Sequence, residues 1–167
     1  MVATTNHIKD PKVESILAEV YDPEIPVLSI LDMGIVHNVV TEGNKVIIDI
    51  IPTYSGCPAM DTISDDIKHA FKQKGITAEV KLKLSPAWST DMISVKGREN
   101  LEAYGIAAPL SEELDKRALI GNQKVLSCPK CQSKNTKMIS QFGSTACKAL
   151  FQCNDCLEPF DYFKCLK

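Results

Sequence analysis

The chain has 167 residues, of which 44% are hydrophobic and 24% are charged, as in an ordinary globular protein. A formal net charge of −2 gives no electrostatic reason to expect nucleic acid or an anionic membrane as a partner. No apolar run approaches the roughly 20 residues of a membrane span, and the N-terminal sequence MVATTNHIKD lacks the apolar stretch of a secretory signal. We therefore expect a cytoplasmic protein whose thiols remain reduced.

The first predicted element is an amphipathic helix of about three turns. Asp10-Pro11 has the form of an N-cap followed by a proline at the first helical position, and apolar residues then recur at helical spacing from Val13 to Val20. The prolines of YDPEIPVLSI end this helix because they force extended or turn conformations.

A β-hairpin is predicted next. The stretches GIVHNVV (34–40) and KVIIDII (45–51) are rich in β-branched residues and flank TEGN, which predicts a four-residue loop. A helical stripe then runs from Met60 to Phe71 and stops at Gly75. In AEVKLKL (78–84), apolar residues alternate with lysines, which predicts a strand with one buried face and one solvated face.

Ser94 is placed to cap a last helix, with Leu101 and Tyr104 on its apolar face. Trp88, the only tryptophan, is expected to anchor the core or its rim. The order helix, two strands, helix, strand, helix predicts a compact α+β domain over roughly residues 8–107.

The cysteines mark the domain boundary, because Cys57 is the only one of seven that lies before residue 128. We predict an α+β domain at residues 1–107, a linker at 108–125 with a short helix at 111–119, and a cysteine-rich domain at 126–167.

The strongest pattern is the pair CPKC and CNDC, which contains Cys128, Cys131, Cys153 and Cys156. Two such knuckles complete a tetrahedral metal site, and the stretches TKMISQF and ALFQC between them suit the strands of a zinc ribbon. A tail this small needs a metal to fold, and zinc is favoured because it is redox-silent. Rubredoxin-like iron and redox or disulfide pairs are the alternatives.

Two further cysteines, Cys147 and Cys165, exceed what one tetrahedral site requires. They are either small buried residues that pack the ribbon or a second thiol pair that holds or passes a metal. The packing partners in the first interpretation are the aromatic residues Phe151, Phe160, Tyr162 and Phe163.

Cys57 lies where a strand ends and a helix begins. If Pro58 is the first helical residue, the positive end of the helix dipole lowers the pKa of the thiol. The three histidines are scattered and indicate no Cys–His dyad, so packing is the simpler interpretation of this thiol. Asp22 and Glu24 of DPEIP are, by the same reasoning, turn and cap residues beside prolines.

Three stretches together resemble the small mixed-sheet α+β domain of iron–sulfur assembly proteins such as SufT and its cytosolic eukaryotic relatives. They are DPEIPVLSILDMGIV (22–36), PTYSGCPAM (52–60) and LSPAWSTDMIS (84–94). With the zinc-ribbon-like β tail, the whole chain resembles the accessory proteins of bacterial phenylacetyl-CoA epoxidase systems.

This resemblance implies maturation of an iron centre rather than catalysis, and the client it implies is the iron–sulfur reductase subunit of the epoxidase. Cys57 would be the functional thiol, with Asp22 and Glu24 near it, and would engage iron or an iron–sulfur cluster transiently. One thiol cannot ligate a cluster alone, so a partner chain, an added ligand or a dimer mate would complete the set. The zinc ligands would be Cys128, Cys131, Cys153 and Cys156.

Two other functions compete with maturation. The chain would be a structural subunit of the oxygenase with no part in metal delivery, or it would be an electron carrier with iron in the four-cysteine site.

Overall fold

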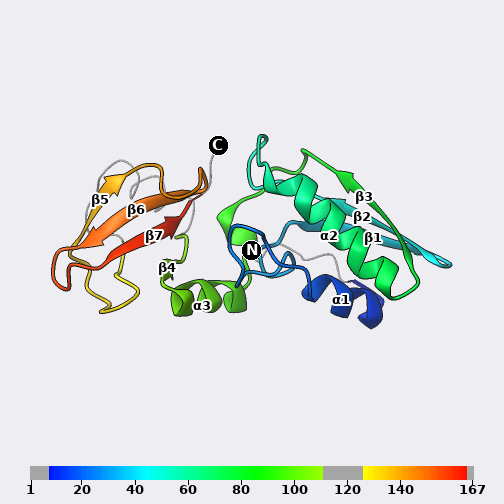
Figure 1. Cartoon of the computed structure of the whole chain (residues 1–167), viewed down its shortest axis with the longest axis horizontal. Coiled ribbons are helices and arrows are strands. Elements are labelled where there is room, and N and C mark those ends of the chain that lie inside the picture. Colours follow the sequence, from blue (N-terminus) through cyan, green and yellow to red (C-terminus); the bar gives the residue numbers. More distant parts are fainter. Residues whose placement is uncertain (1–7, 111–125, 165–167) are drawn as a thin grey trace. The chain divides into compact units, whose positions relative to one another are not determined.

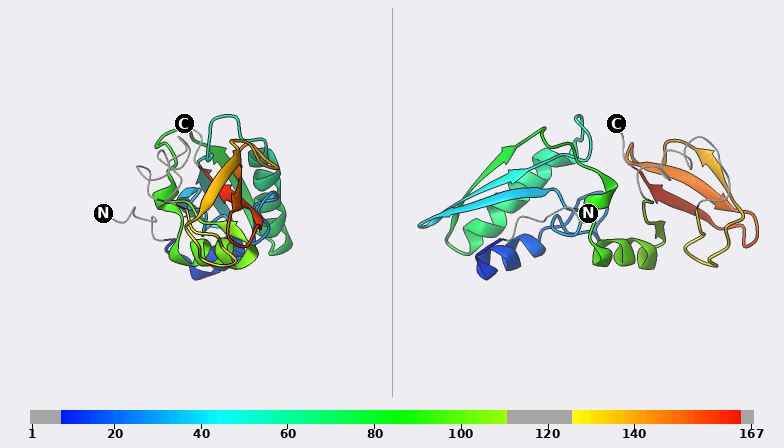
Figure 2. Two further views of the ribbon diagram at one scale, coloured as in Figure 1. Left: turned by 90° about the vertical axis from the view of Figure 1, so that its left-hand side faces the viewer. Right: turned by 180° about the vertical axis from the view of Figure 1, so that it is seen from behind.

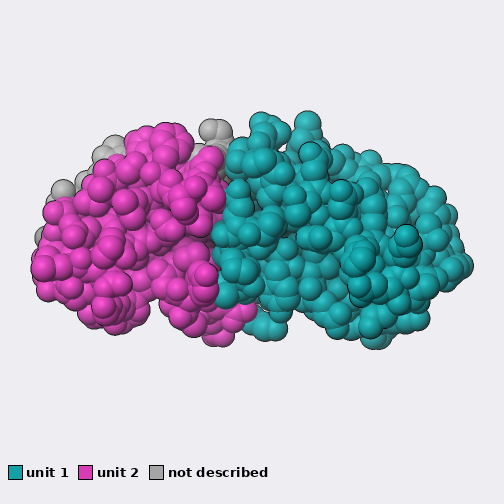
Figure 3. Space-filling view, viewed as in Figure 1, with its two compact units in different colours: residues 1–97 teal, residues 98–167 magenta. Residues whose placement is uncertain are grey.

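The computed structural model describes residues 8–110 and 126–164, which form two compact units that divide between Gly97 and Arg98 (Figures 1 and 3). Within these ranges, every helix is too short or too polar to cross a membrane. The helix predicted at 111–119 and Cys165 lie outside the described residues.

The first unit contains a three-stranded sheet in the order β1-β2-β3, with β1 at Val36–Glu42, β2 at Lys45–Ile50 and β3 at Thr77–Leu82. β1 and β2 are antiparallel, whereas β2 and β3 run parallel. Parallel neighbours cannot be joined by a tight turn, so the chain crosses over through helix α2 at Ala59–Gln73 (Figure 1). The predicted α+β fold with a mixed sheet is confirmed.

The core of this unit lies between the sheet and α2, which covers one face of the sheet in both ribbon views (Figures 1 and 2). Helix α1, Pro11–Ala18, packs against α2, and the predicted cap is present, since Asp10 Oδ1 accepts a hydrogen bond from Lys12 N at 2.9 Å. The predicted apolar stripe of α2 is buried at Ile63, Ile67 and Phe71. Alternate residues of β2 are buried as well: Val46, Ile48 and Ile50.

The hairpin loop is shorter than predicted. Pairing continues to Glu42 opposite Lys45, so only Gly43 and Asn44 form the turn. Gly43 has φ +60°, a conformation that glycine adopts without a steric penalty.

The predicted buried face of the third strand is wrong at its C-terminal end. Leu82 is 53% exposed and Leu84 is 67% exposed, although Val80 before them is partly buried. β3 is an edge strand of the sheet, and no described element covers these two leucines.

Helix α3, Val95–Tyr104, begins as predicted, because the Ser94 hydroxyl accepts a hydrogen bond from Gly97 N at 2.9 Å. Leu101 is buried, but Tyr104 is 56% exposed, so its predicted place on the apolar face is wrong. Trp88 is the expected anchor: it is buried, and its Nε1 donates to the Met33 carbonyl oxygen at 2.9 Å.

Asp32 ties the loop before β1 to the start of α3. Its two carboxylate oxygens accept hydrogen bonds from the hydroxyls of Ser29, at 2.8 Å, and Ser94, at 2.7 Å. Its carbonyl oxygen also accepts from Ser94 N at 2.8 Å. These bonds hold together segments that are 62 residues apart in sequence.

The second unit contains a four-stranded sheet in the order β4-β7-β6-β5. The strands predicted from TKMISQF and ALFQC are present as β5, Thr136–Ser140, and β6, Lys148–Cys153. β7, Pro159–Phe163, pairs antiparallel with β6, and β4, Ile106–Ala107, pairs parallel with β7.

Aromatic rings fill the small core of this sheet. The ring of Phe151 stacks on Phe160 with centroids 6.0 Å apart and meets Tyr162 edge-on at 5.7 Å. The sulfur-bearing residues Cys128 and Cys153 belong to the same buried cluster. The core therefore adjoins the predicted metal ligands directly.

The conformation of Gly34 generates the first prediction. Its φ is +74°, and a Cβ at this position would lie 2.3 Å from the Met92 carbonyl oxygen, in the short 3-10 helix Thr90–Met92. We expect Gly34→Ala to lower the free energy of unfolding of the first unit by roughly 3 kcal/mol or more, because strain and a backbone clash add. Urea unfolding followed by Trp88 fluorescence measures this.

Gly43→Ala is the matched control, because it has a positive φ but no atom near the added Cβ. It should cost only about 1 kcal/mol. Equal losses for the two variants would contradict the clash at Gly34.

Candidate thiol site and four-cysteine metal centre

Cys57 lies in the loop that connects the end of β2 to the start of α2. Its N–H donates to the Tyr54 carbonyl oxygen at 3.1 Å, and its own carbonyl oxygen accepts from Met60 N at 3.4 Å. Pro58 is the N-cap and α2 begins at Ala59, so the thiol sits just before the helix and is half-buried. The location matches the strand-to-helix transition expected from the sequence.

The surroundings of the thiol raise its pKa, so the predicted lowering is wrong. Burial is the largest cause, and the charges of Asp22 and Glu24 add to it. Hydrogen bonds from Ala59 N–H and the Thr53 hydroxyl favour the thiolate and oppose this shift, but they do not overcome it. The start of α2 does stabilise the thiolate through Ala59 N–H, and burial outweighs it.

Asp22 has two roles at this site. It is only 7% exposed, and its Oδ1 accepts hydrogen bonds from the backbone N–H groups of Glu24 and Ile25, both at 2.8 Å. These bonds hold the acidic loop in a turn, as the simpler interpretation of DPEIP expects. The same carboxylate acts electrostatically on Cys57, so the structure brings Asp22, Glu24 and Cys57 to one place.

Thr53 is a site residue that the sequence interpretation missed. It is buried, and its hydroxyl bonds to the Cys57 sulfur. The only signal in the sequence is its place in the same short loop, four residues before the cysteine. A threonine in a loop is common, so this position alone indicates no function.

The thiol site offers one soft sulfur donor and two hard carboxylate groups. Iron accepts both kinds of ligand, whereas a cation that strongly prefers oxygen would make little use of the thiol. One sulfur leaves coordination positions of an iron ion or cluster for groups from outside this chain.

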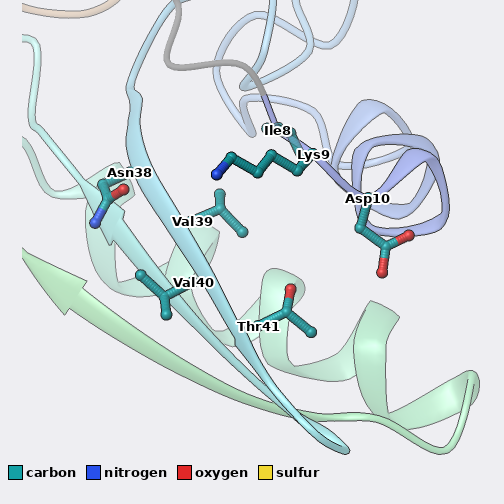
Figure 4. Close-up of a pocket in the computed structure, with 7 residues that line it drawn as sticks. All are labelled: Ile8, Lys9, Asp10, Asn38, Val39, Val40 and Thr41. Atoms are coloured by element: carbon teal, nitrogen blue, oxygen red, sulfur yellow. The ribbon is translucent and has the colours of Figure 1, made fainter.

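A separate groove lies beside β1 and contains none of the predicted site residues. Its volume is about 530 Å³. Ile8, Lys9 and Asp10 line one side, and residues 38–41 of β1 line the other, with the Lys9 side chain extended toward the strand (Figure 4).

The second unit brings together all four predicted metal ligands. The sulfurs of Cys128, Cys131, Cys153 and Cys156 lie within 4.8 Å of one another. The closest pairs join the two knuckles: Cys128 and Cys156 sulfurs are 3.7 Å apart, and those of Cys131 and Cys153 are 3.6 Å apart. A tetrahedral zinc site with Zn–S bonds of about 2.3 Å places its sulfurs about 3.8 Å apart. The cluster therefore fits one metal ion.

The two knuckles have matching backbone turns. Gln132 and Leu157, each directly after the second cysteine of a knuckle, have φ of 61° and 63°. Cys128 N donates to the Ser133 carbonyl oxygen at 2.8 Å, and Cys153 N donates to that of Glu158 at 2.9 Å. These turns direct backbone N–H groups toward the cysteine sulfurs, and the resulting hydrogen bonds stabilise the thiolates.

The four thiols cannot all ionise without a cation. The backbone N–H of Cys156 lowers the pKa of Cys153 to about 7. At Cys131 the Ser133 N–H favours the thiolate, but hydrogen bonds with the other three thiols and burial raise the pKa to about 12. A bound divalent cation would remove this conflict by displacing the shared protons.

Cys147 is not part of this cluster. It is buried, and its sulfur lies 3.1 Å from the Thr145 hydroxyl. Cys165, its partner in the thiol-pair interpretation, is outside the described residues.

Comparison with known proteins assigns each unit to a class. Residues 10–82 match the family model described as "Iron-sulfur cluster assembly protein", and residues 112–164 match "PaaD zinc beta ribbon domain". The crystal structure of a DUF59 domain from Bacillus anthracis is 27% identical, with a TM-score of 0.51, and the match covers 55% of this chain and 89% of that one. The chain therefore combines an iron–sulfur-assembly-type domain with a zinc β-ribbon.

Two relatives with similar sequences give a narrower assignment than the domain class. A protein of Escherichia coli that is named as a subunit of 1,2-phenylacetyl-CoA epoxidase is 45% identical over 163 residues, which cover 95% of this chain and 96% of the relative. An "Fe-S protein maturation auxiliary factor" of Porphyromonas gingivalis is 37% identical over 81 residues, covering 47% of this chain and 76% of that protein. The chain belongs to the PaaD family.

The raised pKa of Cys57 predicts slow alkylation at neutral pH. The thiolate is the reacting form, so the rate with iodoacetamide should rise with pH through a midpoint above the usual value of 9.0 for a thiol. Peptide mapping by mass spectrometry separates Cys57 from the other cysteines.

Two variants test the causes of that shift in opposite directions. Glu24→Gln removes a repelling charge and should lower the midpoint, whereas Thr53→Val removes a stabilising hydrogen bond and should raise it. A midpoint that neither variant moves would contradict the assigned neighbours.

Metal removal should unfold the second unit alone. We expect one zinc per chain, lost on treatment with a strong chelator or in Cys153→Ser, with loss of the ribbon's near-ultraviolet circular dichroism. Trp88 fluorescence should not change, because Trp88 is in the first unit. Cys147→Ser is the control and should keep the metal, while visible absorption that bleaches on reduction would indicate iron instead.

Proposed function

We propose that this chain is a maturation factor for the iron–sulfur or other metal centres of a multicomponent phenylacetyl-CoA epoxidase, in aerobic phenylacetate degradation. It acts as an accessory protein in the cytoplasm and does not itself catalyse epoxidation. The observation that carries the proposal is the grouping of Asp22 and Glu24 around the half-buried thiol of Cys57 in an iron–sulfur-assembly-type domain.

In this function, Cys57 binds the cargo, an iron ion or a cluster, during transfer. The surroundings of the thiol keep it protonated in the absence of cargo. Because the thiolate is the form that reacts, protonation protects Cys57 from oxidation and from non-specific metals. The carboxylates of Asp22 and Glu24 attract a cation to the loop and favour its binding beside the sulfur. The remaining ligands come from the client protein, an added small ligand or a second copy in a homodimer.

The ribbon has a different part. Zinc bound by its four cysteines would be structural, since closed four-thiolate sites leave no open coordination position. It would stabilise a unit too small to fold well on its aromatic core alone. The ribbon then serves to recognise the client, and the client we favour is the reductase subunit that carries an iron–sulfur cluster.

Support from the relatives is of two kinds. The Porphyromonas gingivalis protein is named for Fe–S maturation and matches 81 residues, 47% of this chain. The Escherichia coli relative is named as part of the epoxidase, and it matches nearly the whole chain. A maturation domain joined to a ribbon particular to this family suits a factor dedicated to one client system.

The name of the Escherichia coli relative also favours another candidate, a structural subunit of the oxygenase with no part in metal delivery. Such a subunit would co-purify with the catalytic subunits at fixed stoichiometry and would be needed for activity in vitro. A maturation factor is needed only while the client acquires its metal.

Cys57→Ser tests the maturation role. In a strain that carries this variant, the variant itself should fold and keep its zinc, while the epoxidase reductase loses most of its iron and its visible spectrum. Iron and sulfide analysis of the purified reductase measures the effect. Cys147→Ser is the matched thiol control and should leave the reductase normal. A fully metallated client beside Cys57→Ser would rule out the assigned role of Cys57.

A further inference from the structure

The outer edge of β3 offers free backbone hydrogen-bonding groups. Thr77 N donates to Asn44 O at 3.1 Å and Lys83 N donates to Ile50 O at 2.8 Å, so the odd-numbered residues direct these groups toward β2. Backbone groups alternate in direction along a strand, so those of Val80 and Leu82 point away from the sheet. Among the described residues, β3 has no second neighbouring strand.

The end of this edge is apolar and uncovered. Leu82 and Leu84 are 53% and 67% exposed, and every residue from 81 to 87 is exposed. Large apolar side chains grouped on an open strand edge promote aggregation unless a binding partner covers them. Because β2 and β3 are parallel, this end of β3 and the Cys57 loop leave the sheet on the same side.

The edge is also positively charged. β3 and the exposed segment after it, residues 77–87, contain two lysines, Lys81 and Lys83, and one acidic residue, Glu79. Glu79 already pairs with Lys45 at 2.5 Å and with Lys81 at 3.3 Å. Lys83, between the two exposed leucines, forms no ion pair with another described residue.

We propose that the outer edge of β3 binds an extended segment of the client protein in which acidic and apolar residues alternate. The segment adds a fourth strand to the sheet: its backbone pairs with Val80 and Leu82, its acidic side chains meet the lysines, and its apolar side chains cover Leu84. This inference rests on the proposed function. It names the contacts by which the domain that contains Cys57 recognises its client.

Charge distinguishes this occupant from a second copy of the chain. Two copies joined at this edge would bring the Lys83 side chains of both copies toward each other, which like-charge repulsion opposes. An acidic segment gains attraction from the same lysines. The segment would also lie beside the Cys57 loop, where the client must present its metal site.

The test uses the full chain and a fluorescent eight-residue peptide of alternating valine and glutamate. We expect it to bind, with slower amide exchange at Val80 and Leu82, and the valine–lysine counterpart not to bind. Lys83→Glu and Leu84→Ser should each weaken binding by about tenfold or more, and added salt should reduce the Lys83 effect. The controls Lys96→Glu and Val95→Ser change an exposed lysine and an exposed valine on α3, and should leave affinity unchanged.

Cys57→Ser separates this inference from the proposed function, because the edge should bind the peptide without any metal. Normal peptide binding by Cys57→Ser therefore supports the edge whether or not Cys57 handles iron. No binding at millimolar peptide, protection on β1 instead of β3, or self-association that Lys83→Glu abolishes would each overturn the proposal.

Discussion

The parallel pairing of β2 and β3 is the constraint on which the first unit depends. Parallel strands require a crossover, and α2 supplies it while burying one face of the sheet. The loop that follows β2 and the segment that follows β3 must then leave the sheet at the same end. The bond from Lys83 N to Ile50 O extends the pairing to that end. This topology places the Cys57 thiol, two carboxylates and an open strand edge within one region of one small domain.

Opposing interactions set the pKa of the Cys57 thiol. A helix N–H and a threonine hydroxyl favour the thiolate, whereas burial and the charges of Asp22 and Glu24 favour the protonated thiol, and the second group prevails. Asp22 can remain buried because two backbone N–H groups satisfy its Oδ1. The negative charges of Asp22 and Glu24 therefore act on a thiol that is only half-buried.

The ribbon depends on a different interaction. Its core is a few aromatic rings beside two buried cysteines, an amount of apolar surface that supports little stability alone. Four sulfurs at tetrahedral spacing suit one metal ion, whose binding would add to the stability of this fold. The two units therefore hold cysteine in different settings, as four converging sulfurs in one and as a single half-buried thiol in the other.

Local patterns in the sequence determined much of the structure of this protein. The Asp10 cap, the apolar stripe of α2 and the two Cys-x-x-Cys knuckles specify their structures within a few residues, because capping, helical periodicity and metal geometry are short-range. The tertiary structure alone decided the exposure of Leu82 and Leu84, the bonding of Thr53 to Cys57 and the direction of the thiol pKa shift. The Thr53–Cys57 bond depends on the conformation of an irregular loop, and the other two depend on which distant segments pack together. Neither kind of interaction leaves a periodic signal in the sequence.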